Sequence, residues 1–510
     1  MPKNDRKIVI VGGGIAGLCA AVYAQQCGYQ AQVLEMHDMA GGLATSWRRG
    51  AYTFETCLHW LYGSNPNRAM FRLWREVFDI EKLNFVGPTE FARIETEDGD
   101  SLAIPTDVDR LEKEFLDRAP QDSVAIDHLA STIRRLQQFE MPDPAKSWIG
   151  NASALLHDLA CLPALREVSK ITAREYGQRF TDPLIKNFFA GGDVSDLSAL
   201  ALIISLAWMG ARDADYVVGG AQAIIRLIEA RLASLGGQVR FGAKVERILI
   251  EDGAAVGVQL AGGENINADW VISAADGHST LYDLLGGQYA GGAATKRYSE
   301  FVPFPSYLQV SLGVALDLHA LPAYLTRLLQ SPLQVDPATV LNQLSFRIFH
   351  FDPTFAPAGK TAVTCFLPTR NFAYWDKLRH DSPEKYREEK RRVSSAVIEV
   401  LEARVPGLRA AVEVVDVSTP ASVIRYTGNW QGSMEGWLLT PKTGIRPLPR
   451  TLPGLRNFMM IGQWTMPGGG LPSGPMTARP AIQAICKQDR VPFTPRSAPV
   501  RHSQRAAALL

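Results

Sequence analysis

The clearest pattern of apolar and polar positions lies near the start of the chain. Residues 8–11 form a continuous apolar run, IVIV, which is typical of a buried parallel strand. A glycine-rich turn and a run of small residues follow, and a second apolar stretch ends at Glu35. This order predicts a strand, a helix and a second parallel strand, the βαβ unit of an α/β fold.

Later patterns predict a mixture of helices and strands. Residues 67–80, NRAMFRLWREVFDI, put their apolar side chains on one face of a helix. Residues 305–316 and 360–368 have the apolar character of strands. The longest uncharged run, residues 197–211, is shorter than the about 20 residues that a bilayer span needs. It predicts a buried helix, with an interfacial helix beside a lipid-sized cavity as the alternative.

The turn after the first strand has the spacing of a dinucleotide-binding site. Gly12, Gly14 and Gly17 form G-x-G-x-x-G, which permits a tight turn, close approach to a pyrophosphate and close helix packing. The following helix directs its free N–H groups toward the phosphates. Glu35 lies 21 residues after Gly14, where a carboxylate accepts hydrogen bonds from a ribose. The pattern predicts NAD or FAD rather than NADP.

A second glycine-rich turn decides between these two cofactors. Residues 457–488 predict a strand, a Gly/Pro loop and a helix that begins near Pro475. A simple NAD dehydrogenase does not need such a turn, whereas Gly462 lets the backbone approach the ribityl and phosphate region of a flavin cofactor. The helix dipole then points at the N1–C2 edge of the flavin. These residues favour FAD.

Composition narrows the class of protein further. The chain of 510 residues is long enough for two or three domains. Its content of 46% hydrophobic and 21% charged residues is typical of a globular protein. The 53 basic and 52 acidic residues show none of the basic excess of nucleic-acid-binding proteins. Six scattered cysteines predict reduced thiols in a cytoplasmic protein and no metal site, and the N-terminus predicts no secretory leader. Residues 491–510 predict a flexible tail, with a basic membrane-binding patch as the alternative.

Three motifs together resemble a known family. VGGGIAGL, GGLATSWRRGAYTFETCLHW and GQWTMPGGGLPSGPMTAR are similar to the phytoene desaturase and carotenoid isomerase branch of the amine-oxidase-type FAD flavoproteins. Residues 219–278 resemble the helix and β-meander of that family. The chain departs from the common pattern at Leu43, Glu55, Cys57 and Gln463.

The resemblance implies an α/β fold with α+β insertions. A discontinuous Rossmann-type FAD-binding domain would comprise residues 1–64, 215–284 and 450–490. A substrate-binding domain of mixed sheet and helix would comprise residues 65–214 and 285–449. The FAD contacts that the resemblance implies are Gly12, Gly14, Ile15, Ala16, Gly17, Glu35, Met36, Gly42, Leu43, Ala44, Val245, Gly462, Gln463, Leu471, Pro472 and Met476.

The same resemblance places residues 55–60 beside the flavin ring. Glu55, His59 and Trp60 are therefore the catalytic candidates. A histidine with a pKa near ~6.5 can exchange a proton at neutral pH, although a buried structural histidine is an alternative for His59. Arg48 and Arg49 are more typical of a solvated or phosphate-facing pair.

The expected reaction is desaturation of a hydrophobic isoprenoid, carotenoid-like or lipid-like substrate, with hydride transfer to flavin N5. Only one nucleotide fingerprint is present, so oxygen or a quinone is the expected electron acceptor. One alternative is a cis–trans isomerase or saturase that uses reduced FAD, and another is a flavin-free lipid escort protein. An amine oxidase is less favoured, because no C-terminal aromatic cage stands out. Peripheral contact with a membrane is a further expectation.

Overall fold

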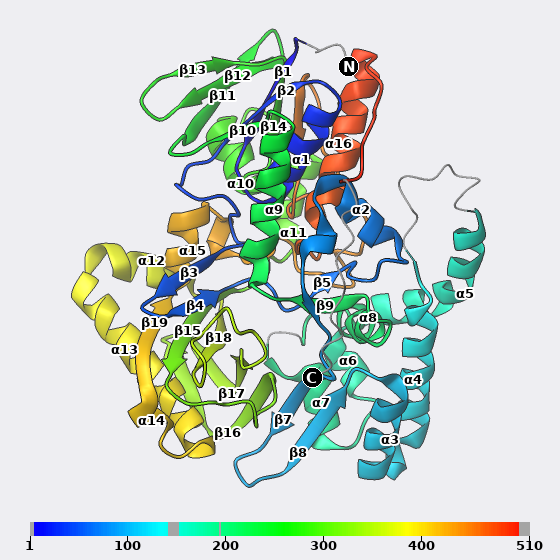
Figure 1. Cartoon of the computed structure of the whole chain (residues 1–510), viewed down its shortest axis with the longest axis vertical. Helices are drawn as coiled ribbons and strands as arrows, with labels where there is room; N and C mark the ends of the chain where they lie inside the picture. Colours follow the sequence, from blue (N-terminus) through cyan, green and yellow to red (C-terminus); the bar gives the residue numbers. More distant parts are fainter. Residues whose placement is uncertain (1–4, 141–151, 193–194, 499–510) are drawn as a thin grey trace.

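A five-stranded parallel sheet forms the core of one half of the molecule. The structure is a computed structural model that describes residues 5–140, 152–192 and 195–498. The strand order is β10-β2-β1-β14-β20. Figure 1 shows β10, β2, β1 and β14 in the upper part of the molecule. The bounds are β1 (Lys7–Val11), β2 (Gln30–Leu34), β10 (Gln238–Arg240), β14 (Trp270–Ser273) and β20 (Phe458–Met460). The sheet thus joins three distant segments, and all five strands lie inside the regions predicted for the FAD part; the exact domain boundaries stay a prediction.

The two faces of this sheet are covered differently because side chains alternate along each strand. Ile8 and Ile10 pack in one apolar cluster with α1 (Ile15–Gln26), α9 (Gly220–Ser234) and α16 (Ser473–Asp489). Val9 and Val11 pack in another cluster with the antiparallel meander β11 (Val245–Glu251), β12 (Ala254–Leu260) and β13 (Asn265–Asn267). The predicted βαβ unit, meander and C-terminal helix are therefore all present.

A seven-stranded sheet forms the core of the other half, in the order β19-β15-β18-β17-β16-β7-β8. Its neighbours are antiparallel apart from the parallel pair β16 and β7. The bounds are β7 (Glu90–Glu95), β8 (Ser101–Pro105), β15 (Ser306–Val314), β16 (Tyr324–Asp336), β17 (Thr339–Ile348), β18 (Thr361–Thr369) and β19 (Val412–Ser418). Its helices are α12 (Phe372–Asp381), α13 (Pro383–Arg404), α14 (Leu408–Ala411) and α15 (Pro420–Thr427).

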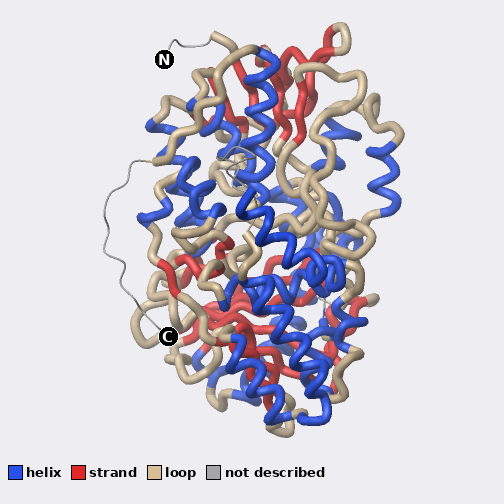
Figure 2. Tube along the Cα trace, turned by 90° about the vertical axis from the view of Figure 1, so that its right-hand side faces the viewer, coloured by secondary structure: helices blue, strands red, loops and turns tan. Residues whose placement is uncertain are grey.

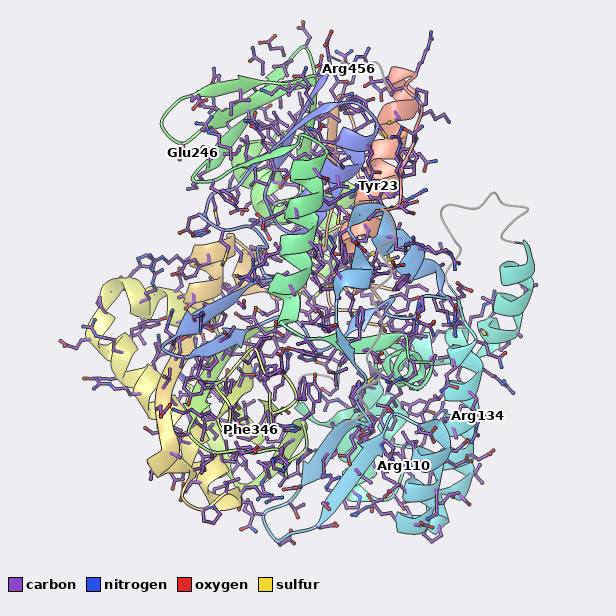
Figure 3. All side chains as sticks on the ribbon, viewed as in Figure 1. Tyr23, Arg110, Arg134, Glu246, Phe346 and Arg456 are labelled. Carbon is purple, nitrogen blue, oxygen red and sulfur yellow. The ribbon has the colours of Figure 1, made fainter. Side chains whose placement is uncertain are left out.

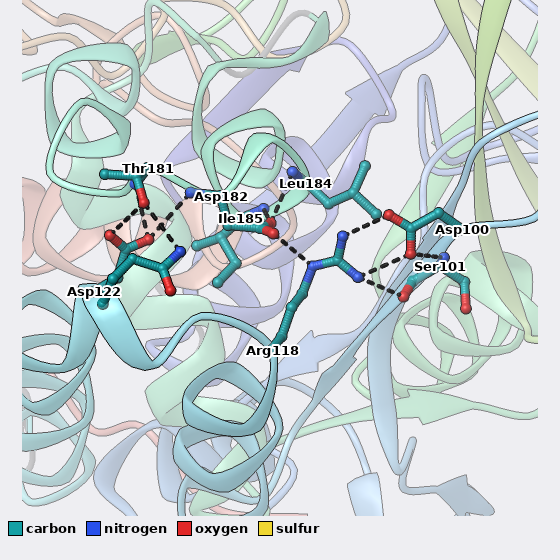
Figure 4. Close-up of polar contacts among 9 residues, drawn as sticks. Asp100, Ser101, Arg118, Asp122, Thr181, Asp182, Leu184 and Ile185 are labelled. Carbon is teal, nitrogen blue, oxygen red and sulfur yellow. Dashed lines mark hydrogen bonds and ion pairs between the residues drawn. The ribbon is translucent and has the colours of Figure 1, made fainter.

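A helical insertion packs beside this second sheet. It comprises α3 (Val108–Arg118), α4 (Ser123–Gln137), α5 (Ala152–Ser169), α6 (Ala173–Gly177), α7 (Pro183–Ala190) and α8 (Ala199–Gly210). Viewed from the side, its helices cover the lower strands (Figure 2). Arg118, at the end of α3, joins α7 to the turn between β7 and β8, because Nε donates to Asp182 Oδ2 at 2.8 Å and Nη2 donates to Asp100 Oδ2 at 2.6 Å (Figure 4). Asp182 also caps α7 by accepting from the N–H groups of Leu184 and Ile185.

Short elements connect the two halves. They are the hairpin β3 (Ser46–Arg49) and β4 (Tyr52–Glu55), the small sheet of β5 (Leu61–Tyr62), β9 (Ala214–Val217) and β6 (Phe85–Val86), and the helices α2 (Ala69–Val77), α10 (Gly277–Ser279) and α11 (Ala293–Glu300). The helix predicted over residues 67–80 corresponds to α2, and Met70, Phe71 and Trp74 are buried as its pattern predicts. The strands predicted over residues 305–316 and 360–368 correspond to β15 and β18.

The uncharged run of residues 197–211 forms α8, and its burial confirms the prediction of a core helix. Ile203, Leu206 and Met209 are each at most 3% exposed. The alternative, an interfacial helix beside a lipid-sized cavity, stays a prediction. Among the described residues, none of the helices combines the length and apolar character needed to cross a bilayer.

The C-terminal segment corrects one prediction. Residues 491–498 are not a flexible tail, because they pack along α1. Gln26 Nε2 donates to Arg496 O at 3.1 Å, and Arg496 N–H donates back to Gln26 Oε1 at 3.1 Å. Ala498 N–H donates to Arg75 O at 2.7 Å, and Phe493 lies against Tyr23. Residues 499–510 lie outside the described part of the chain.

Candidate cofactor and substrate site

A cavity of about 2300 Å³ extends between the two halves of the molecule. Its lining includes Glu246, on the meander strand β11, and Phe346, on β17 of the seven-stranded sheet, which lie in different halves of the molecule (Figure 3). The walls between these two residues include both predicted glycine turns and one side of α8. A cofactor region and a substrate region therefore share one space.

The first glycine turn forms one wall of the cavity at the end of β1. Gly12 has φ +98°, and a Cβ there would lie 3.3 Å from the backbone of Ala274. A Cβ on Gly17 would lie 2.0 Å from Gly12 O, so only glycine allows α1 to pack this close to the turn. A Cβ on Gly14, by contrast, would meet nothing closer than Gly41 O at 3.9 Å. Gly14 thus leaves open the space that a pyrophosphate requires.

Residues 41–44 lie across this first turn. Gly41 N–H donates to Gly13 O at 2.9 Å, and a Cβ on Gly42 would lie 3.4 Å from Gly14 Cα. Leu43 and Ala44 continue the wall of the cavity from this contact. Residues 12–14 and 41–42, all of them glycines, therefore face each other with no side chains between them. We call this pair of loops the glycine cradle.

Two helices begin at this cradle. The N-terminus of α1 has no side-chain cap at Gly14, and α16 has none at Pro472. A Cβ on Gly462 would lie 3.2 Å from Ala16 Cβ, so the loop after β20 reaches the first turn of α1. Uncapped N-terminal N–H groups bind anions and stabilise negative charge. This arrangement fits a pyrophosphate near α1 and a flavin ring near α16.

Glu35 presents a fixed carboxylate at the end of β2. Its Oε2 accepts from Gly13 N–H at 2.7 Å and its Oε1 accepts from His37 N–H at 3.0 Å. The side chain is buried yet lines the cavity, as does Val245 at the start of β11. A carboxylate held in this way can accept hydrogen bonds from ribose hydroxyls.

The structure brings the predicted cofactor residues together around one cavity. Gly17 is the exception, since it lies beneath the turn and contributes packing. The residues that line the cavity are Gly12, Gly14, Ile15, Ala16, Glu35, Met36, Gly42, Leu43, Ala44, Val245, Gly462, Gln463, Leu471, Pro472 and Met476. The glycine cradle, the uncapped N–H groups of α1 and α16 and the carboxylate of Glu35 fit FAD. The contact of each single residue with FAD stays a prediction.

The predicted catalytic residues separate into two groups. His59 and Trp60 line the cavity, and His59 is exposed, so it is not a buried structural histidine. Tyr324 OH donates to His59 O at 2.9 Å and holds that part of the loop. Glu55 does not line the cavity: it is fully buried, and its Oε2 accepts from Ala221 N–H at 2.9 Å.

Glu55 holds the loop of residues 55–60 against the start of α9. A Cβ on Gly220, which has φ +66°, would lie 2.2 Å from Glu55 Oε2, so this contact requires glycine at position 220. Burial raises the pKa of Glu55 to about 7. Its position thus supports a role in placing the loop that carries His59.

Sequence reasoning missed Arg347, a charged residue in the wall of the cavity. It lies on β17, is 5% exposed, and donates from Nη1 to Leu58 O at 3.1 Å. Its guanidinium carbon lies 4.7 Å from the centre of the Phe366 ring. Burial lowers the pKa of Arg347 to about 10, opposed by Glu55, Cys57 and Glu435. No motif surrounds Arg347, so no local signal could have found it.

Sequence reasoning also missed which side of α8 faces the cavity. The lining residues are Leu200, Ala201, Leu202, Ile204, Ser205 and Trp208. Most of these recur at intervals of three or four positions and therefore form one side of the helix. This side gives the substrate region an apolar wall.

The cradle and the discontinuous parallel sheet define a flavin-dependent oxidoreductase fold, and comparison with known proteins identifies its family. The model of the flavin containing amine oxidoreductase family matches residues 15–479. The chain belongs to this family. It is an oxidoreductase, and its cofactor is FAD.

Curated relatives match the chain over nearly all of its length. The 4,4'-diapophytoene desaturase (4,4'-diapolycopene-forming) of Methylomonas sp is 25% identical over 96% of this chain and 97% of its own. The prolycopene isomerase 1 of an Oncidium hybrid cultivar is 23% identical over 91% and 81%. Among solved structures, an oxidoreductase from Methanosarcina mazei aligns with a TM-score of 0.59 at 17% identity, over 94% of this chain and 100% of that one. The structural likeness supports the fold alone.

Proposed function

We propose that this chain is an FAD-dependent enzyme that desaturates carbon–carbon bonds of a hydrophobic isoprenoid or carotenoid-like substrate. The continuity of the cavity carries this proposal. The space that begins at the glycine cradle continues past residues 57–60 into a region walled by α8 and the seven-stranded sheet. An elongated apolar molecule would reach the flavin from that region while its chain stays out of water. The similarity to diapophytoene and phytoene desaturases favours the same substrate class.

Each part of the chain has a defined task in this proposal. When bound, FAD supplies a two-electron acceptor for a hydride that leaves a substrate carbon. The glycine loops and Glu35 hold the cofactor, and Leu200 and Ile204 of α8 align the substrate chain and exclude water. His59 exchanges the proton lost from the neighbouring substrate carbon. Glu55 fixes the loop that carries His59 and Trp60.

The proposal also concerns the acceptor and the location of the enzyme. Electrons leave the reduced cofactor to oxygen or a quinone. The enzyme is cytoplasmic and collects its substrate by peripheral contact with a membrane, because such substrates dissolve in lipid.

A second candidate is a cis–trans isomerase that uses reduced FAD without net oxidation. It is favoured by the prolycopene isomerases, which match this chain about as well as the desaturases do. The same cavity would serve both reactions, because both require a long polyene beside the flavin.

Anaerobic mixing of the yellow, FAD-loaded protein with candidate carotenoids in micelles separates the two reactions. A desaturase bleaches the flavin absorbance and adds one double bond to the product for each flavin reduced. An isomerase changes the geometry of the polyene only after the flavin has been reduced beforehand, and the product keeps its mass. If FAD-loaded protein neither bleaches nor isomerises any polyene, the proposal is wrong.

A further inference from the structure

Arg347 is a buried charged side chain in the wall of the substrate region, and an entirely hydrocarbon substrate does not explain it. A guanidinium has five N–H donors. Within the described residues, Arg347 donates one hydrogen bond, to Leu58 O, and has no salt bridge. The side chain is 95% buried in a wall of the cavity that also includes Phe346 and Phe366. None of the nitrogens of Arg347 is both fully buried and unpartnered, so the donors that do not bind Leu58 O are accessible from the cavity.

Such a placement is costly for the folded protein. A buried charge destabilises the fold unless opposite charges and hydrogen bonds compensate for its lost hydration. Glu55 and Glu435 supply favourable electrostatic interactions with Arg347, but among the described residues no salt bridge joins either of them to it, and Glu55 Oε1 is buried without a hydrogen-bond partner. Contact with the Phe366 ring adds a weak cation–π interaction. The remaining N–H groups are therefore available to a ligand in the cavity.

The position of Arg347 relates it to the site of reaction. Leu58, whose carbonyl it binds, lies between Cys57 and His59 in the loop that would pass the flavin ring. In the sheet, Arg347 is paired with Tyr324, whose hydroxyl binds His59 O. A substrate atom bound by this guanidinium would thus lie beside the loop that carries His59, rather than at the far end of the cavity.

We infer that Arg347 binds an oxygen atom of the substrate, so that the substrate is an oxygenated isoprenoid: an apolar chain that bears a carboxylate or a conjugated carbonyl. This inference rests on the proposed function, which supplies the isoprenoid chain and the reaction. The planar guanidinium is suited to both acceptors, since it forms paired N–H bonds to a carboxylate and single bonds to a carbonyl. The nearby Glu55 and Glu435 moderate the positive charge and leave both acceptors compatible with the site.

Binding of matched probes to FAD-loaded protein tests this assignment. The probes are a C20 isoprenoid acid, the corresponding aldehyde and a hydrocarbon polyene of equal chain length, and the readout is the change in flavin absorbance on titration. Wild type is expected to bind at least one oxygenated probe more tightly than the hydrocarbon. Arg347→Met keeps the approximate length of the side chain but removes its donors. We expect it to weaken binding of that oxygenated probe by about 10- to 100-fold and to leave the affinity for the hydrocarbon unchanged.

Two further variants separate a binding role from a structural one. Arg347→Lys keeps the charge but loses the planar fork, so it is expected to recover part of the affinity for the acid and less for the aldehyde. Arg370→Met removes an exposed arginine from the wall of the same cavity. We expect it to change the affinity for each probe by no more than about twofold.

Three results would overturn the inference. In the first, Arg347→Met weakens all probes equally, which indicates a structural role. In the second, wild type prefers the hydrocarbon and desaturates it, which leaves the proposed function intact and removes only the oxygen contact. In the third, Arg347→Met slows reoxidation of reduced flavin by oxygen while binding is unchanged, which assigns the guanidinium to the oxidant. If wild type binds none of the probes and reacts with no polyene, the proposed function is refuted as well.

Discussion

At the scale of single residues, two glycines of the same fingerprint are constrained for different reasons. Gly14 has an extended backbone with φ −68°, and a Cβ there would meet nothing closer than Gly41 O at 3.9 Å, so Gly14→Val should fold. Its side chain would occupy the space assigned to the pyrophosphate. We expect the purified variant to lose most of its FAD, measured by flavin absorbance per chain, while its circular dichroism matches that of wild type stripped of FAD.

Gly17→Val provides the contrast to Gly14→Val. A Cβ there overlaps Gly12 O, so we expect a loss of stability of about 1–3 kcal/mol before any effect on the cofactor. A Gly14→Val protein that stays yellow would show that the cradle does not hold the pyrophosphate.

A buried carboxyl makes stability depend on pH. Burial raises the pKa of Glu55 from its ordinary 4.5 to about 7, so the folded protein holds this proton more tightly than the unfolded chain. The stability due to the protonated form is present below the unfolded pKa and is lost as pH rises toward about 7, by up to about 3 kcal/mol. Glu55→Gln keeps an acceptor for Ala221 N–H and removes this titration.

We therefore expect the melting temperature of wild type to fall relative to that of Glu55→Gln between about pH 5 and about pH 8. Asp213 and Asp276 also have raised pKa values and are present in both proteins, so the difference between the two curves isolates Glu55. Parallel curves would show that Glu55 is already ionised in the folded protein.

These residues also show where sequence reasoning succeeds and where it ends. The glycines and Glu35 are predictable because their roles follow from spacing within one βαβ unit. Glu55 and Arg347 are not, because each depends on a partner far along the chain: Ala221 is 166 positions from Glu55, and Leu58 is 289 positions from Arg347. No periodicity within a single segment records such contacts.

At the scale of elements, α8 is predictable as a buried helix but not as a cavity wall. Its residues are apolar on every side, so no contrast within the sequence marks the side that faces the cavity. Ala201 lies on that side and is partly accessible from the cavity. Enlarging this side chain should therefore fill space intended for substrate rather than strain the core.

Ala201→Phe tests this assignment of the α8 wall. We expect at least a tenfold loss of kcat/KM for the polyene that wild type converts, because a phenyl ring would block the passage of the chain. FAD content and melting temperature should stay close to those of wild type, and Ala201→Ser is the control for polarity without bulk. Unchanged kinetics in the Phe variant would mean that the substrate does not pass along α8.

At the scale of the whole molecule, the chain must bring remote segments together before the site exists. The five-stranded sheet takes strands from residues 7–34, 238–273 and 458–460, and α16 then packs on α1. The resemblance between motifs predicted this discontinuous arrangement, whereas the docking of residues 491–498 was not predictable from their composition. Proline and basic residues suggest a free end, but the contacts depend on the surface that α1 and α2 present together.

Removal of the docked segment should loosen the cofactor half. Arg479 on α16 pairs with buried Glu76 on α2, and its guanidinium lies 5.0 Å from the centre of the Phe493 ring. Phe493 therefore shields an ion pair that becomes weaker when water reaches it.

A chain that ends at residue 490 loses this cover and the hydrogen bonds to Gln26. We expect its free energy of unfolding to be smaller by about 1–3 kcal/mol and its melting temperature to be lower by a few degrees. A chain that ends at residue 498 keeps these contacts, and its melting temperature should equal that of wild type. Phe493→Ala in the full chain should reproduce part of the loss, and equal melting of the two truncated chains would show that the segment contributes nothing to the fold.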